Sequence, residues 1–223
     1  MADGLRLGVV DDHPVVLRGI LAAVVDLYPE ITDTFTTSTV SALLGAQRSL
    51  DVVVLDVRLA DGSDPVENVE AIVAAGLPVL LYTQDPRAGL LARCLRAGAM
   101  GLVDKSEDPA VLADAIRRVA AGQPYFSSEW AAIVEGAEGW PIPDLGARES
   151  ETLSLYATGL PLKSVARRMH VSEETAKEYL DRVRKKYALV GRPINSRVDL
   201  YIRAVEDGLG PAPGDVPPGG THP

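Results

Sequence analysis

Five short apolar runs alternate with five helix-like segments between residues 5 and 122, and this alternation limits the possible folds more than any other feature. Short apolar runs that end in turn residues are typical of strands buried on both faces of a parallel sheet. The intervening segments carry apolar residues at helical spacing, as Val16, Ile20 and Val24 do. The pattern predicts an α/β doubly wound domain with helices on both faces of its sheet.

The order of the predicted elements is strand, then helix, five times over. Pro14 stands near the start of the first helix, where its missing N–H costs little. We expect strands at residues 5–10, 33–37, 51–56, 78–83 and 100–105, and helices at 13–28, 39–46, 68–76, 86–98 and 108–122.

Beyond residue 122 the composition changes. Residues 123–143 are rich in Pro, Gly and aromatic side chains, which indicates a linker with a short helix near 128–135. Every pattern in residues 144–208 is helical, so we expect a small all-α domain there. The Pro- and Gly-rich residues 209–223 have too little apolar bulk to fold and are expected to be disordered. The first domain is then placed at residues 1–122.

The formal net charge of -9 would argue against a nucleic-acid partner if the charges were evenly spread. Residues 144–203 carry twelve Lys or Arg against eight Asp or Glu, whereas the rest of the chain carries ten against 23. This asymmetry predicts an acidic module joined to one that can meet a polyanion.

The single cysteine, Cys94, excludes an internal disulfide framework and suits a reducing cytosol. No apolar run reaches the length of about 18 residues that a membrane-spanning helix needs. The N-terminus "MADGLRLGVV" has no basic leader before a long apolar segment. We therefore expect a soluble, cytoplasmic protein with no membrane partner.

Polar side chains stand at the ends of four predicted strands. Asp11 and Asp12 follow the first strand, Asp56 ends the third, Thr83 ends the fourth and Lys105 ends the fifth. Because the carboxyl ends of parallel strands meet at one edge of a sheet, these side chains should share a crevice. The simpler alternative is that each aspartate forms a turn or caps a helix.

The chemistry of these groups is mutually consistent. Crowded carboxylates are costly to keep ionised unless a cation joins them, and Mg²⁺ prefers carboxylate oxygens. A carboxylate such as Asp56 is a competent nucleophile for phosphoryl transfer, and the ammonium of Lys105 can hold phosphoryl oxygens. The hydroxyl of Thr83 can donate to a phosphoryl oxygen. We expect His13 to begin a helix rather than bind a metal.

Residues 5–122 resemble the receiver domain of response regulators through "DDHP", "VLDVRLADG", Thr83 and "GAMGLVDK". The resemblance implies phosphoryl transfer from a sensor histidine kinase to Asp56. It also implies a Mg²⁺ site made by Asp11, Asp12, Asp56 and the main-chain carbonyl of Arg58, with Thr83 and Lys105 sensing the phosphate. One departure is Leu102, where the family usually carries a Tyr or Phe that takes part in switching.

The second half of the chain contains a helix with a basic face. Ser172 is a plausible N-cap, and the acids that follow it suit the positive end of the helix dipole. Two interpretations remain open from charge alone: the second helix of a helix-turn-helix, which enters the major groove, or a solvated helix of a bundle. His170, just before this helix, is expected in a turn.

The segment "LGARESETLSLYATGLPLKSVARRMHVSEETAKEYLDRVRKKYAL" resembles the LuxR-type helix-turn-helix. With the receiver it makes a NarL/FixJ-like transcription factor. The resemblance implies four helices, of which the last, near 195–207, serves for dimerisation, and it places Thr175 and Lys177 on double-stranded DNA. The full set of expected DNA contacts is Thr175, Lys177, Glu178, Asp181, Arg182, Lys185 and Lys186.

This sequence departs from the LuxR-type pattern on the face expected to meet bases. Ala176 and Tyr179 replace the usual Val and His, and Glu178 and Asp181 are acidic. Carboxylates repel phosphates but can accept a hydrogen bond from N4 of cytosine. The connection "VGRPIN" also looks longer than usual, which could move the dimer contact.

The predicted function is a two-component response regulator, a transcription factor whose homodimerisation and DNA binding are controlled by phosphorylation of Asp56. We expect a phosphoprotein and not an enzyme. Two alternatives remain: a regulator controlled by a ligand or partner instead of phosphate, and a Mg²⁺-dependent phosphohydrolase. The second leaves the helical C-terminal part unexplained.

Overall fold

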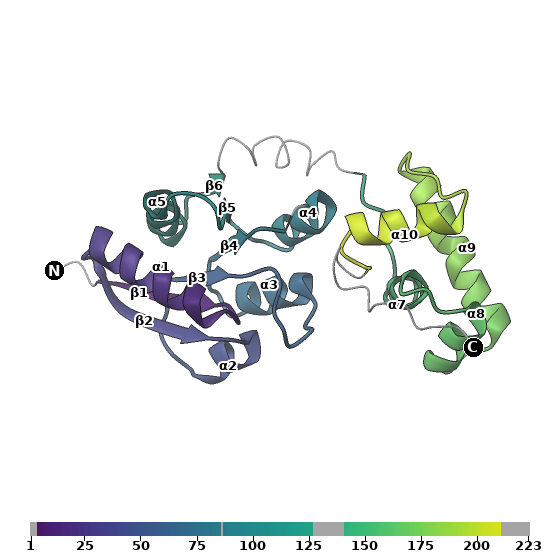
Figure 1. Cartoon of the computed structure of the whole chain (residues 1–223), viewed down its shortest axis with the longest axis horizontal. Coiled ribbons are helices and arrows are strands. Elements are labelled where there is room, and N and C mark those ends of the chain that lie inside the picture. Colours follow the sequence, from purple (N-terminus) through teal and green to yellow (C-terminus); the bar gives the residue numbers. More distant parts are fainter. Residues whose placement is uncertain (1–3, 86, 127–140, 211–223) are drawn as a thin grey trace. The chain divides into compact units, whose positions relative to one another are not determined.

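The computed structural model describes residues 4–85, 87–126 and 141–210, which fold into two compact units. One unit holds all the strands and the other holds the last four helices (Figure 1). The short helix expected at 128–135 and nearly all of the tail expected to be disordered lie outside the described residues. Within those residues, no helix combines the length and the apolar character needed to cross a bilayer.

The first unit is built on a six-stranded sheet in which every pair of neighbouring strands is parallel. The strand order is β2-β1-β3-β4-β5-β6. The strands are β1 (Leu5–Val10), β2 (Ile31–Thr37), β3 (Val52–Leu55), β4 (Val79–Thr83), β5 (Gly101–Asp104) and β6 (Tyr125–Phe126). The central strands are apolar on both faces, which confirms the α/β doubly wound fold.

Helices cover both faces of this sheet, with α1 and α5 on one side and α2, α3 and α4 on the other (Figure 1). The helices are α1 (Pro14–Leu27), α2 (Val40–Gly45), α3 (Pro65–Ala74), α4 (Ala88–Arg96) and α5 (Pro109–Ala120). On the side of α1 and α5, Ile20, Val24 and Ile116 pack with Val54 and Leu80 in one buried cluster. Burial of this kind is the main driving force for the layered arrangement.

Proline and aspartate set where the helices begin. Asp64 caps α3 and Asp108 caps α5, each through hydrogen bonds from main-chain N–H groups, and Pro65 and Pro109 follow them. Proline fits the first helical position because that N–H has no partner within the helix. The prediction that α3 begins at residue 68 was therefore three residues late, since the Asp64 cap was not recognised.

The sheet contains one strand more than predicted. Tyr125 and Phe126 pair in parallel with Gly101 and Leu102 and form β6, inside the segment that we expected to be a linker with a short helix near 128–135. A two-residue strand has no apolar periodicity to reveal it. Gly101 permits the pairing, because a Cβ atom at this position would lie 2.9 Å from the carbonyl oxygen of Tyr125.

The second unit is all-helical, as predicted. Its helices are α7 (Ala147–Ala157), α8 (Leu162–Arg168), α9 (Glu173–Leu189) and α10 (Arg197–Glu206). Leu153, Val183, Tyr187 and Leu200 are fully buried and tie α7, α9 and α10 into one core. The turn before α9 passes through His170, whose φ of 56° is in the left-handed region. Its position in a turn was predicted correctly.

Candidate functional site

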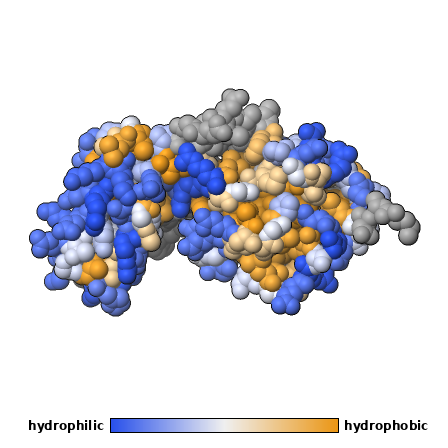
Figure 2. Space-filling model, turned by 180° about the vertical axis from the view of Figure 1, so that it is seen from behind, coloured by the Kyte–Doolittle hydropathy of each residue, from blue (hydrophilic) through white to orange (hydrophobic). Residues whose placement is uncertain are grey.

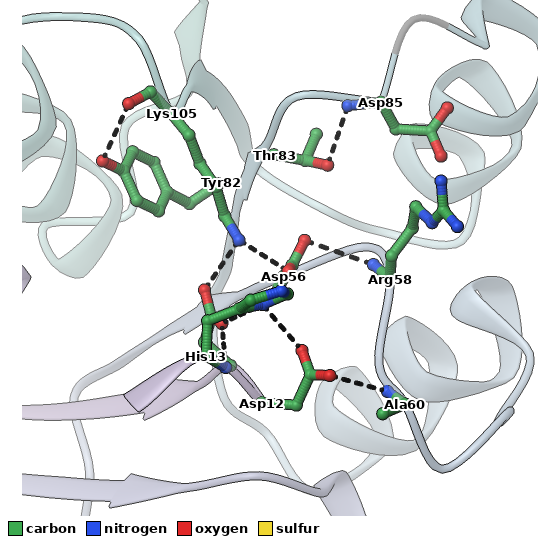
Figure 3. A network of polar contacts seen from close by, with 10 residues as sticks. Asp12, His13, Asp56, Arg58, Ala60, Tyr82, Thr83, Asp85 and Lys105 are labelled. Atoms are coloured by element: carbon green, nitrogen blue, oxygen red, sulfur yellow. Dashed lines mark hydrogen bonds and ion pairs between the residues drawn. The ribbon is translucent and has the colours of Figure 1, made fainter. Parts of the chain in front are cut away.

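The parallel sheet brings the polar strand ends together at one edge (Figure 3). Asp11 and Asp56 directly follow β1 and β3, Thr83 is the last residue of β4, and Lys105 directly follows β5. Main-chain hydrogen bonds extend past the strands and fix these positions, with Asp56 N donating to the carbonyl of Val10 at 2.8 Å. The expected convergence of these residues is therefore present.

Lys105 is the central cation of the cluster. Its Nζ atom donates to Asp11 Oδ2 at 2.7 Å and to Asp56 Oδ2 at 2.6 Å. The side chains of Asp11 and Asp56 are only 2% and 5% exposed, and that of Lys105 is 13% exposed. A buried charge must be paired, so the three side chains depend on one another.

The surroundings of Asp56 disfavour the charged form of its carboxyl group. Burial raises the pKa of the Asp56 carboxyl above its usual range, and the hydrogen bond from Lys105 offsets this only in part. For Lys105, burial acts to lower the pKa, but the bonds to Asp11 and Asp56 outweigh it and leave the pKa raised. The site therefore holds a firmly charged ammonium and a carboxylate that gains from further positive charge.

Asp12 completes the acidic cluster. Its Oδ2 accepts from Ala60 N at 3.1 Å, while its buried Oδ1 has no hydrogen-bond partner. His13 precedes the first residue of α1, as expected of a residue that begins a helix, and its ring lies 3.0 Å from Asp12 Oδ1. One ligand atom from each of Asp11, Asp12, His13 and Asp56 falls within 4.8 Å of the others.

This donor set fits a hard divalent cation. Three carboxylates match the oxygen ligands that Mg²⁺ takes, and one of their oxygens, Asp12 Oδ1, accepts no hydrogen bond and has only the His13 ring beside it. The crevice beside them has room for bound waters. The crevice has a volume of about 550 Å³ and is lined by Asp12, Asp56, Arg58, Thr83 and Lys105, among others. The arrangement can hold a cation and a phosphoryl group side by side.

Arg58 and Thr83 frame this crevice. Arg58 donates its main-chain N–H to Asp56 Oδ1 at 3.2 Å, which holds the loop after β3 close to the acid. Thr83 Oγ1 accepts from Asp85 N at 3.1 Å, so the hydroxyl hydrogen is left to donate elsewhere. Both residues lie where the sequence predicted, although Arg58 contributes an N–H and not its carbonyl to the contacts that the structure shows.

Two residues of the site were not anticipated. The ring of Tyr82 lies 6.0 Å from the Lys105 ammonium, and its hydroxyl donates to the Lys105 carbonyl at 3.5 Å. Ala60 supplies only a main-chain N–H, which no side-chain pattern can reveal. Tyr82 could have been found from its place one residue before Thr83. Leu102 is completely buried, so it packs inside the unit.

In the second unit, α9 presents a charged face. Lys177, Glu178, Arg182 and Lys185 are exposed, whereas Ala176, on the other side of the helix, is buried. The remaining candidates, Thr175, Asp181 and Lys186, are partly exposed. The N-terminus of α9 is capped by Ser172, whose hydroxyl accepts from Thr175 N at 3.0 Å, as predicted. Much of the visible face of this unit is hydrophilic (Figure 2).

Comparison with known proteins explains both units. The model of the response regulator receiver domain matches residues 7–117, and the model of bacterial regulatory proteins of the luxR family matches residues 143–204. The chain belongs to the two-component response regulators with a LuxR-type DNA-binding domain. The predicted resemblance is thus confirmed for both parts of this response regulator.

Relatives of this response regulator match it over nearly its full length. The DNA-binding transcriptional activator DevR/DosR of Mycobacterium tuberculosis is 31% identical, over 96% of this chain and 100% of the relative. The nitrate/nitrite response regulator NarP of Escherichia coli is 29% identical, over 92% and 99%. The function predicted from the sequence, a DNA-binding transcription regulator of a two-component system, agrees with this family.

Solved structures give the same architecture. The response regulator ChrA of a heme-sensing two-component system is 29% identical, with a TM-score of 0.50 over 93% of this chain and 99% of that one. RcsB from Salmonella enterica serovar Typhimurium, solved bound to a promoter with a phosphomimetic, has a TM-score of 0.61. At 20% identity and 91% coverage of this chain and 98% of its own, RcsB supports the fold alone.

Proposed function

We propose that Asp56 accepts a phosphoryl group from a sensor histidine kinase and that its phosphorylation controls DNA binding by the second unit. The observation that carries this proposal is the convergence of Asp11, Asp56 and Lys105, with Nζ–O distances of 2.7 and 2.6 Å. A site of this kind would neutralise the negative charge of an aspartyl phosphate at Asp56.

The transfer itself needs little from the protein beyond position and charge. A carboxylate oxygen of Asp56 attacks phosphorus, the bond from phosphorus to the kinase histidine nitrogen breaks, and that nitrogen keeps the electron pair. Mg²⁺, held by Asp11, Asp12, Asp56 and the main-chain carbonyl of Arg58, would supply the positive charge that makes the approach of two anions feasible. Lys105 then binds a phosphoryl oxygen as a point charge.

The new group changes the partners of Lys105 and Thr83. The phosphoryl oxygens compete with Asp11 for the Lys105 ammonium, and they offer an acceptor to the Thr83 hydroxyl. Phosphorylation acts on a pre-existing equilibrium between an inactive and an active form. To turn a mostly inactive population into a mostly active one, it must favour the active form by about 5.5 kcal/mol.

The output is binding to double-stranded DNA as a homodimer. The charged face of α9 would enter the major groove, with Thr175 and Lys177 near the N-terminus of the helix, Arg182 near its middle, and Lys185 and Lys186 toward its C-terminal end. Two copies, joined through α10, would place their α9 helices on half-sites about one helical turn apart. A regulator of bacterial promoters works beside the chromosome, so the proposal places it in the cytoplasm.

A second candidate is a regulator that a ligand or partner controls without phosphotransfer. Leu102 favours it, because a completely buried leucine cannot exchange an inward position for an outward one as a partly polar aromatic ring can. In that case the acidic cluster would bind a cation, but phosphorylation of Asp56 would not change the second unit.

The deciding experiment is intact mass after incubation with acetyl phosphate and Mg²⁺, followed by sizing and DNA binding of the same sample. We expect the parent to gain one phosphoryl group and to form dimers, and the Asp56→Asn variant to do neither. Asp61→Asn is the matched control, because Asp61 is an exposed neighbour in the same loop. No mass gain by the parent would refute phosphotransfer, and a mass gain without dimers or tighter DNA binding would favour the second candidate.

A further inference from the structure

Several charged side chains of α9 take part in contacts within the unit, and beyond the first turn, which holds Glu173 and Glu174, one acid does not. Arg184 donates to Asp181 at 2.9 Å, and Lys186 donates to Glu149 at 2.7 Å. The carboxylate of Glu178 is exposed and, in the described part of the chain, takes part in no hydrogen bond or ion pair. Beyond its first turn, the helix therefore carries one acid whose oxygens are available to another molecule. Glu173 and Glu174 are also exposed, but they lie in the first turn, where the positive end of the helix dipole suits them.

The missing partner of Glu178 is informative, because the sequence offers one. Arg182 stands four residues after Glu178, the spacing and order at which Glu and Arg usually attract each other on a helix. In the structure the Arg182 guanidinium instead lies over the ring of Tyr179 at 4.8 Å and 3.9 Å from Glu149. Tyr179 and Glu149 thus draw Arg182 away and keep Glu178 unpaired.

The two acids that follow the first turn of α9 consequently have different roles. Asp181 is held along the helix by Arg184 and is only partly exposed. Glu178 lies in the second turn of α9, flanked by the unpaired ammonium of Lys177. In a helix-turn-helix the N-terminal residues of the second helix contact base edges, so a side chain at this level can reach a base while its basic neighbour binds phosphate.

We propose that Glu178 is the residue that selects cytosine in each half-site, by accepting a hydrogen bond from its N4 amino group in the major groove. This inference rests on the proposed docking of α9 in the major groove. It assigns the base contact to Glu178, while Asp181 remains in its ion pair with Arg184.

Cytosine is the base whose major-groove edge suits a carboxylate. Guanine and thymine present acceptor atoms there, which repel the oxygens of Glu178. Adenine presents an N6 donor beside the N7 acceptor, so attraction and repulsion offset each other, whereas cytosine presents its N4 donor alone. A mismatched base pair in a specific site typically lowers affinity by about 5- to 150-fold.

The test is selection from a random double-stranded DNA library by the full chain treated with acetyl phosphate and Mg²⁺. The parent is compared with Glu178→Ala, Glu178→Gln and the matched control Asp181→Asn. Single-base variants of the selected duplex then give relative affinities at each position. Thermal unfolding of all four proteins shows that the variants remain folded.

We expect the parent to select a C·G pair at one position of each half-site. Glu178→Ala should lose this preference and keep the others, Glu178→Gln should move it toward adenine, which glutamine binds through N6 and N7, and Asp181→Asn should retain it. The inference is overturned if a selected motif is unchanged in both Glu178 variants, or if Asp181→Asn abolishes the same preference. Failure of the parent to select any duplex would instead contradict the proposed docking of α9.

Discussion

Replacing Lys105 with methionine should destabilise the first unit at neutral pH and without Mg²⁺. The side chain keeps its length but loses the ammonium that bonds Asp11 and Asp56 at 2.7 and 2.6 Å. Both carboxylates are almost completely buried, so water from the crevice replaces the lost partner only in part. Removal of one member of a buried ion pair typically costs about 3–5 kcal/mol.

Protonation of Asp56 limits how much free energy of unfolding the Lys105→Met variant can lose. Asp56 can escape its unpaired charge by taking up a proton, and protonating an ordinary carboxyl group at pH 7 costs about 4 kcal/mol. We therefore expect the variant to lose about 3–4 kcal/mol at pH 7, within this limit.

The pH dependence follows from the direction of the pKa shifts. Burial already raises the pKa of Asp56, and without Lys105 the main influence that lowers it is gone. Between the raised folded-state pKa and the lower unfolded-state pKa, the folded variant binds a proton that the unfolded chain does not, so its stability rises as the pH falls through this window. The deficit relative to the parent should shrink by up to about 1.4 kcal/mol per pH unit. Lys105 in the parent, with its raised pKa, is fully charged throughout this range.

Hydrogen exchange of the amides in β1 and β3 between pH 5 and 7 measures this deficit, because it reports on the first unit alone. Added Mg²⁺ should recover part of the lost stability, and Lys105→Arg, which keeps the charge, should lose much less. A deficit that stays constant across the pH range and ignores Mg²⁺ would refute the view that unpaired carboxylates cause it.

Three further changes test other parts of the structure. Glu149→Ala should destabilise the second unit by about 1–3 kcal/mol, because it removes the acceptor for Lys186 and for the N–H at the start of α7; exchange of α7 and α9 amides checks this. Gly101→Ala should lower the free energy of unfolding of the first unit by about 1–3 kcal/mol through overpacking, because the new Cβ would press on β6. Hydrogen exchange of the Tyr125 amide should become faster, and an unchanged rate would contradict the dependence of β6 on this glycine. Lys177→Ala should lower the slope of log affinity against log salt by about one unit, as binding titrations at several salt concentrations would show.

Most of the fold could be predicted from local patterns in the sequence. Buried parallel strands are continuous apolar runs, and Asp108, Pro109 and Ser172 mark helix starts by chemistry that acts within one turn. The approach of Asp11 to Asp56 also followed from the sequence, because parallel strands leave their carboxyl ends at one edge. These features depend on neighbouring residues or on a general rule of topology.

The features that escaped prediction depend on single long-range contacts. β6 exists because Gly101 allows close approach of Tyr125, and two residues carry no periodic signal. The side chain of Arg182 turns toward Glu149, which is 33 positions away in the chain, and not toward Glu178 on its own helix. Such choices between competing partners are settled by packing, which spacing alone does not encode.

Tyr82 connects the strand ends with the α1 and α5 side of the sheet without involving Leu102. Successive side chains of a strand face opposite ways, so Tyr82 packs in the cluster of α1 and α5 while Thr83 faces the crevice. The Tyr82 hydroxyl donates to the Lys105 carbonyl, and the Lys105 ammonium lies 6.0 Å from the Tyr82 ring (Figure 3). A displacement of the ammonium toward a phosphoryl group would therefore change its contact with this ring. A conformational change at the site would then reach the second unit through the face of the sheet that α1 and α5 cover. The replacement of a switching aromatic ring by Leu102 would not weaken this route.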